Sequence, residues 1–228
     1  MSSYDAPLAN LSCAQLTLSR ADNPLLNDVN VEFYPGERVT IEGESGVGKS
    51  SWLMTLSGTL TADSGDWRIN GVPMHGWDDV TRSRYVASVD QQVVFFSGTL
   101  RNNLSLVRKA LSDDELWSLL SLMRLKNLVL ELPQGLDSAI GEAQRLFSGG
   151  EMQRLAIVRA ALAKTPVLIL DEATAHLDQI SEQTVLEGLR QYHPEQIQLI
   201  ISHRATRVQQ VNRRLRVEAG DVKESRHD

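Results

Sequence analysis

The sequence has very little cysteine and no long apolar run, and these absences exclude several classes of protein. Cys13 is the only cysteine among 228 residues, so no disulfide can form within the chain. We interpret it as a reduced, structural side chain of a cytosolic protein. Apolar runs such as residues 167–170 end in charge after a few positions, whereas a membrane-spanning helix needs about 20 apolar residues. The first residues also lack the basic start and apolar stretch of a signal peptide.

Positive charge is scarce as well. The chain carries 23 Lys and Arg against 29 Asp and Glu, a net charge of −6, so we expect no broad electrostatic binding to nucleic acid. Hydrophobic residues make up 42% and charged residues 23%, which is ordinary for a globular protein and excludes disordered, collagen-like and coiled-coil chains. The length suits one large domain or two small ones, and it is long enough to bury a sizeable core.

The periodicity of apolar residues changes twice along the chain. Early segments alternate as half-buried strands do, the middle is helical, and later segments alternate strand with helix. Strands that alternate with helices predict a mostly parallel sheet covered on both faces, while the early strands predict an antiparallel unit. We expect a capping box between Ser112 and Glu115. The predicted strands are 11–20, 25–33, 38–42, 67–69, 167–170 and 198–201, and the predicted helical segments are 50–60, 99–132, 149–163 and 179–191.

A glycine-rich loop between a predicted strand and a predicted helix fits the phosphate-binding loop pattern. Its residues are Gly43, Glu44, Ser45, Gly46, Val47, Gly48, Lys49 and Ser50, with Ser51 following. Glycines let backbone N–H groups surround phosphates, and the helix N-terminus adds partial positive charge. We expect Lys49 to reach the β- and γ-phosphates and the Ser50 hydroxyl to bind Mg²⁺.

Two carboxylates stand at the end of an apolar strand, at Asp171 and Glu172. In phosphoryl transfer, the first carboxylate at such a position organises Mg²⁺ and its waters. The second can act as the general base that polarises the attacking water. The sequence therefore predicts a nucleotide triphosphatase.

A third motif narrows the family. Phe147 is followed by Ser148, Gly149, Gly150 and Glu151, and a helix is predicted to begin there. This segment resembles the signature of ATP-binding cassette (ABC) ATPases, usually Leu-Ser-Gly-Gly-Gln, with Phe147 for Leu and Glu151 for Gln. The resemblance implies that the signature touches the γ-phosphate of ATP held by another subunit. ATP is then buried between two cassettes arranged head to tail, in a homodimer or a pseudo-dimer.

The same resemblance implies roles for four other residues. Gln91, with Gln92 as the alternative register, resembles the Q-loop glutamine that contacts Mg²⁺ and couples to the membrane domain. Asp178 resembles the D-loop aspartate, and His203 resembles the switch histidine that contacts the γ-phosphate. Arg20 stands where the family usually stacks an aromatic ring on adenine, and a guanidinium can also stack on a base; the alternative is a simple turn residue. We interpret the remaining histidines as surface residues: His75, His176, His193 and His227.

Two segments narrow the resemblance to exporter-type cassettes. Residues 96–104 resemble the segment after the exporter Q-loop, and residues 138–142 resemble the exporter X-loop with three departures. The resemblance implies a P-loop NTPase (RecA-like) α/β core, with an antiparallel β subdomain and a helical subdomain at about 97–163, in one ABC ATPase domain spanning 1–228.

For function, the resemblance implies an ATPase that uses ATP and Mg²⁺. It implies work with the transmembrane domain of an exporter, on the cytoplasmic face of the membrane. That domain is either a separate chain or a fused one, and Met1 with its short leader favours a chain that starts here. The alternative is a soluble ABC-type ATPase acting as a mechanical or regulatory module. No residue of the sequence indicates the substrate.

Overall fold

The computed structural model describes residues 7–21, 23–108, 111–140, 147–202 and 211–225. The N-terminal strands form the predicted antiparallel sheet, in the order β2-β1-β4-β5. Their alternating burial shows that one face packs inward and the other meets solvent. The bounds are β1 Leu11–Arg20, β2 Asn23–Phe33, β4 Ser64–Ile69 and β5 Val72–Pro73.

A second sheet of six strands has the order β12-β11-β3-β10-β9-β6. All its neighbours pair in parallel except β11 and β12, which form a hairpin. The α/β fold with a mostly parallel sheet is thereby confirmed. Strands β6, β11 and β12 were not predicted from the sequence. The bounds are β3 Arg38–Glu42, β6 Val86–Val89, β9 Val167–Asp171, β10 Ile197–Ile201, β11 Arg213–Glu218 and β12 Asp221–Glu224.

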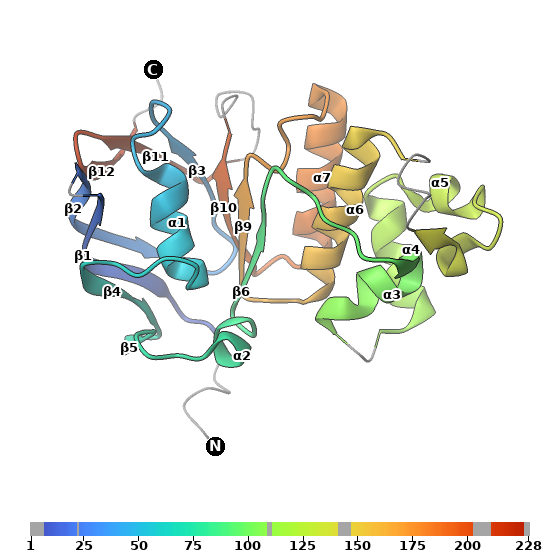
Figure 1. Ribbon diagram of the computed structural model, residues 1–228, viewed down its shortest axis with the longest axis horizontal. Helices are drawn as coiled ribbons and strands as arrows, with labels where there is room; N and C mark the ends of the chain where they lie inside the picture. Colours follow the sequence, from blue (N-terminus) through green and yellow to red (C-terminus); the bar gives the residue numbers. More distant parts are fainter. Residues whose placement is uncertain (1–6, 22, 109–110, 141–146, 203–210, 226–228) are drawn as a thin grey trace.

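Helices cover both faces of the parallel sheet (Figure 1). Helix α1 (Lys49–Ser57) buries Trp52, Leu53 and Leu56 in a core shared with the antiparallel sheet. Helices α6 (Gly149–Leu162) and α7 (Gln179–Tyr192) pack on the opposite face, against Leu168 and Leu170 of β9. Two cores therefore lie on either side of the sheet, and apolar strands buried on both faces are expected there.

The helical middle is broken into short pieces where a continuous pattern was expected. Helix α1 likewise stops at Ser57, because Gly58 adopts the left-handed conformation. The pieces of the middle are α3 (Leu100–Leu104), η1 (Ser105–Val107), α4 (Asp113–Leu122), α5 (Lys126–Leu130) and η2 (Gly135–Asp137). Two short strands, β7 (Gly98–Thr99) and β8 (Ala139–Ile140), pair beside them. A further short helix, α2 (Asp79–Arg82), lies earlier in the chain, before β6.

The expected capping box at α4 forms only in part. The Ser112 hydroxyl accepts from the Glu115 backbone N–H at 3.2 Å. The Glu115 carboxylate instead contacts Arg108, Lys164 and Tyr192, which lie outside α4. Three charged or polar partners outcompete one backbone N–H, so Glu115 ties α4 to the end of α7 and the loop after α6.

The parallel pairing fixes where the functional residues lie. Strand β10 pairs with β3 on one side and with β9 on the other. The segments that follow β3, β6 and β9 therefore meet at the carboxyl edge of the sheet, where ligands bind in open α/β sheets. These segments carry the glycine-rich loop, Gln91 and Glu172.

Candidate nucleotide-binding site

The glycine-rich loop has a backbone that only glycine tolerates at its two ends. A Cβ on Gly43, whose φ is +147°, would lie 2.5 Å from the Val217 carbonyl oxygen. Gly48 has a φ of +111° and is the N-cap of α1. The loop thus packs tightly on β11 and leads directly into the helix, as the motif predicts.

The Lys49 side chain is hydrogen-bonded to the backbone of its own loop. Its Nζ donates to the carbonyl oxygens of Gly43 at 2.8 Å and Glu44 at 2.7 Å. Burial lowers the pKa of Lys49, and the nearby carboxylates of Glu172 and Asp171 act in the opposite direction. The ammonium group therefore lies close to both acidic residues of the β9 motif.

A cavity of about 230 Å³ opens on this loop. Arg20 lines it from the end of β1, and its role in stacking on a base stays a prediction. Leu25 also lines it, next to Gly48, and was not singled out from the sequence because an apolar residue near a strand start has no motif. The described lining is Arg20, Leu25, Ser45, Gly46, Gly48, Lys49, Ser50, Ser51 and Glu172. Glu44 and Val47 instead line a second cavity behind the loop, beside β11.

The two acidic residues lie in different surroundings. Burial raises the pKa of Asp171, and the charges of Asp90 and Glu172 act in the same direction, while a hydrogen bond with Ser50 opposes them. Glu172 has a φ of +53°, an uncommon backbone conformation for a residue other than glycine. Its backbone N–H donates to the Ile201 carbonyl oxygen of β10 at 2.9 Å.

The signature residues form the N-terminus of α6. Ser148 is the N-cap: its Oγ accepts from the Glu151 N–H at 3.3 Å, and the Glu151 carboxylate accepts from the Ser148 N–H at 2.7 Å. Glu151 is thus half of a capping box. The hydroxyl proton of Ser148 is not used in that bond. Gly149 is exposed, and a Cβ there would meet nothing within 4 Å.

The D-loop packs against this helix start. A Cβ on Gly150 would lie 3.4 Å from the Leu177 side chain and 3.7 Å from the His176 carbonyl oxygen. Asp178 caps α7 by accepting from the Ser181 N–H at 2.9 Å, and this bond lowers the pKa of Asp178. The predicted signature and D-loop residues are therefore neighbours.

The signature and the glycine-rich loop do not meet within one chain. No signature residue belongs to the described lining of the 230 Å³ cavity. Figure 1 shows the starts of α1 and α6 at the same edge of the molecule but on opposite sides of β9 and β10. One chain therefore carries two separate helix N-termini of the kind that binds anions, at Lys49 and at Gly149.

The remaining predicted residues have mixed outcomes. Gln91 is exposed in the bend after β6, and Gln92 lines a hollow with Val94 and Arg159. His203 and part of the 138–142 segment lie outside the described residues, as does His227. The surface interpretation holds for His75 and His176, which are exposed. It was wrong for His193, which is half-buried with its pKa lowered by burial.

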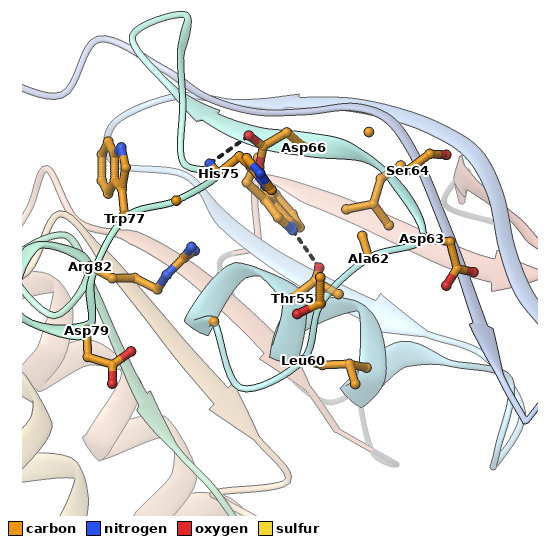
Figure 2. A pocket seen from close by; sticks show the side chains of 16 residues that line it. Thr55, Leu60, Ala62, Asp63, Ser64, Asp66, His75, Trp77, Asp79 and Arg82 are labelled. Atoms are coloured by element: carbon orange, nitrogen blue, oxygen red, sulfur yellow. Dashed lines mark hydrogen bonds between the residues drawn. The ribbon is translucent and has the colours of Figure 1, made fainter.

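A separate cavity of about 360 Å³ lies at the far end of α1 and contains none of the motif residues (Figure 2). Several of its polar groups bond to protein partners. Trp67 Nε1 donates to Thr55 Oγ1 at 2.8 Å, and Asp66 accepts from the His75 N–H at 2.7 Å. Arg82 donates to two backbone carbonyl oxygens. We therefore assign no chemistry to it.

Comparison with known proteins identifies the family. The ABC transporter family model matches residues 26–175, which is most of the chain. The chain belongs to the ABC transporter family. It therefore carries an ATP-binding, ATP-hydrolysing domain, as the motifs predicted. Within the described residues, no helix is long and apolar enough to cross a membrane.

Known relatives of this ABC domain are much longer than the chain. The mycobactin import ATP-binding/permease protein IrtB of Mycolicibacterium smegmatis is 34% identical over 219 residues, covering 96% of this chain and 38% of IrtB. The ATP-dependent lipid A-core flippase of Xanthomonas campestris is 36% identical over 203 residues, covering 89% of this chain and 34% of the flippase. A bacterial Atm1-family ABC exporter with ATP bound superposes with a TM-score of 0.87 at 27% identity, covering 96% of this chain and 38% of that one.

Proposed function

We propose that this ABC domain binds ATP between two cassettes arranged head to tail, hydrolyses it, and thereby powers export by a membrane partner. The observation that supports the dimer is the separation of the two anion-binding halves in one chain. The loop around Lys49 and the helix start at Ser148 both offer backbone N–H groups and a helix N-terminus to phosphate. A second cassette, identical or similar, places its signature over the first cassette's cavity.

Within this arrangement each residue has a separate task. Lys49 leaves its two carbonyl acceptors to contact the phosphates, and the loop N–H groups hold them. Glu172 lines the cavity and orients the attacking water as general base. Ser148 and Gly149 meet the γ-phosphate from the opposite cassette, supported by Asp178. His203 and Gln91 complete the site, and Arg20 stacks on the base.

The residues present fit a magnesium ion. Ser50 and Asp171 are hydrogen-bonded to each other, and both are oxygen donors of the kind Mg²⁺ prefers. Asp171 is a half-buried carboxylate near the acids Asp90 and Glu172, so a divalent cation there would offset the repulsion between like charges. No group of three or more His, Cys, Asp or Glu in the described part of the chain could hold a metal by itself. Ser50 and Asp171 would thus hold Mg²⁺ together with the phosphates and Gln91, and the ion would neutralise phosphate charge.

A surface next to Gln91 suits the membrane partner. Val94 and Phe96 are 58% and 60% exposed. Val94 lines the hollow beside Gln92, where Arg159 also stacks on the Phe95 ring at 4.9 Å. An apolar, pre-ordered surface that continues from the Q-loop fits a helix of a transmembrane domain, on the cytoplasmic side. We propose that residues 1–228 act as one ABC ATPase domain whose helical subdomain, at about 97–163, carries part of this surface.

The test uses Glu172→Gln, which keeps the shape of the side chain but removes the base. We expect ATP binding to persist while turnover falls about 10²-fold or more. The variant should sediment as a dimer with ATP and as a monomer with ADP, because only ATP has the γ-phosphate that the signature contacts. Glu195→Gln, on the exposed turn before β10, is the matched control. Unchanged turnover, or equal association with both nucleotides in the presence of the membrane partner, contradicts the proposal.

A further inference from the structure

The turn that carries Glu172 is fixed to α7 by one buried side-chain hydrogen bond. Thr174 Oγ1 donates to Glu182 Oε1 at 2.6 Å. The two residues are 3% and 4% exposed, so the bond is shielded from water. A carboxylate buried in this way needs hydrogen-bond donors, and removing one leaves a costly unpaired acceptor. The bond therefore constrains the position of Thr174 relative to the helix.

Thr174 lies two residues from Glu172 within a chain of short turns. The Ala175 N–H donates to the Glu172 carbonyl oxygen, and the Leu177 N–H donates to the Thr174 carbonyl oxygen, each at 3.0 Å. On the other side, the Glu172 N–H is held by Ile201 of β10. Glu172 thus lies between β10 and α7, and the Thr174 side chain is one connection of this turn to α7.

The positive φ of Glu172 makes this connection consequential. An αL conformation in a residue other than glycine persists only where the surrounding structure holds it. Backbone bonds hold the upstream side through β10. Downstream, the turn is held by Thr174 and then by Asp178 at the N-cap of α7. We therefore expect loss of the Thr174 bond to let the backbone relax and shift the Glu172 carboxylate.

The same turn also supports the signature. Leu177, which is hydrogen-bonded to Thr174, packs against the position of Gly150 at the start of α6. Glu172 serves the ATP on its own cassette, whereas Gly150 faces the ATP of the other cassette in the proposed dimer. One rigid turn therefore connects the two composite sites.

We propose that Thr174 and Glu182 are positioning residues for hydrolysis: their hydrogen bond holds the general base Glu172 in its strained, productive conformation. This inference rests on the proposed function, because it assigns Glu172 as the base. Neither residue belongs to the described lining of the cavity. They act through Glu172.

The experiment measures kcat and KM for Thr174→Val, which removes the hydroxyl and keeps the shape. We expect kcat to fall about tenfold or more with KM within about twofold, because base alignment affects the chemical step and not ground-state binding. Thr174→Ser restores the donor and should recover most of the loss. Thr184→Val is the matched control. It removes a threonine hydroxyl of α7 that donates to the Ile180 carbonyl oxygen of the same helix at 2.8 Å, and it should leave kcat unchanged.

Repeating the Thr174 substitution in a Glu172→Gln protein distinguishes a positioning role of Thr174 from a general loss of stability. In Glu172→Gln, where the base is absent, Thr174→Val should change single-turnover hydrolysis by no more than about twofold. Assays are run well below the lowest melting temperature, and Thr174→Ala replaces Thr174→Val if the latter does not fold. An equal loss in both backgrounds, or a Ser variant as slow as Val, overturns the inference. If Glu172→Gln itself hydrolyses ATP normally, the proposed function fails first; if only Thr174→Val is normal, the inference alone fails.

Discussion

Glu115 allows a prediction whose size can be worked out from the structure. Its carboxylate accepts from Tyr192 Oη at 2.5 Å and pairs with Lys164 Nζ at 2.7 Å and with Arg108. Burial alone acts to raise the pKa of Glu115, but the hydrogen bonds from Lys164, Tyr192 and Arg108 outweigh it and lower the pKa to about 2. The usual value is 4.5. The charged form is therefore stabilised in the folded state.

The pKa shift sets an upper limit on that stabilisation. A change from 4.5 to about 2 corresponds to about 3.4 kcal/mol, at about 1.36 kcal/mol per unit. The Arg108 and Lys164 side chains are 30% and 44% exposed, so water screens the pairs and about 1–2 kcal/mol is the realistic share. We expect Glu115→Gln to lower the melting temperature by about 2–8 °C for a chain of this length.

The pH dependence gives the sharper test. A carboxylate with a depressed pKa contributes its full stabilisation above the unfolded-state pKa and loses it as the pH falls through the folded-state value. The difference in unfolding free energy between wild type and Glu115→Gln should therefore be full at pH 7 and shrink between about pH 4.5 and pH 2. Urea unfolding at several pH values measures it, with exposed Glu131→Gln as the control. A difference that stays constant down to about pH 3, or that is absent at pH 7, refutes the reasoning.

Two further predictions concern the nucleotide site. Arg20→Tyr should tighten ATP binding by no more than about 30-fold, from a stacking gain of roughly 0.5–2 kcal/mol, and sharpen the preference for ATP over GTP with kcat nearly unchanged. Titrations with both nucleotides measure this; weaker ATP binding would mean that Arg20 already makes the better contact. Gly43→Ala should weaken ATP binding about tenfold or more, because the added Cβ meets the Val217 carbonyl oxygen and forces the loop to move. Calorimetric titration of a folded variant with unchanged affinity would contradict it.

Much of the fold could be predicted because its signals are local. Strand β3, the glycine-rich loop and α1 follow one another without interruption, and β9 is an apolar run that ends in charge. Strand β6 could not be found in this way. It is four residues long, and it exists because Val86–Val89 pairs with Val167–Leu170 across some 80 positions of sequence.

The C-terminal hairpin was missed for a different reason. Strand β11 alternates buried Leu215 and Val217 with charged residues, a pattern that can be read as a strand. The arginines at its start favour a solvent-exposed interpretation, yet Arg213 pairs with Glu37 and Arg214 with Glu42. Ion pairs with residues that are remote in sequence therefore allow a segment with several charges to form a strand of the central sheet.

The candidate site likewise contains residues that local motifs predict and contacts that depend on tertiary packing. Residues within motifs, such as Lys49 and Asp171, could be named because motif and local structure coincide. The Thr174–Glu182 bond had no sequence signal, since it crosses a loop between two elements and depends on how α7 packs. Glu151 was predicted as a signature residue that departs from the usual glutamine; in the structure its carboxylate completes a capping box that requires no nucleotide.

The capping box and Lys49 together bear on why ATP should close the proposed dimer. Lys49 is bonded to two carbonyl oxygens of its own loop, and the start of α6 is capped by Ser148 and Glu151. Each half-site therefore keeps its shape without phosphate. At Lys49, contact with ATP replaces the two existing bonds and yields only the difference in free energy, so the loop alone gains little from the γ-phosphate. The two halves acting on one phosphate gain more, because the second contact is made within an already ordered complex. Closure should thus depend on the γ-phosphate and be lost with ADP.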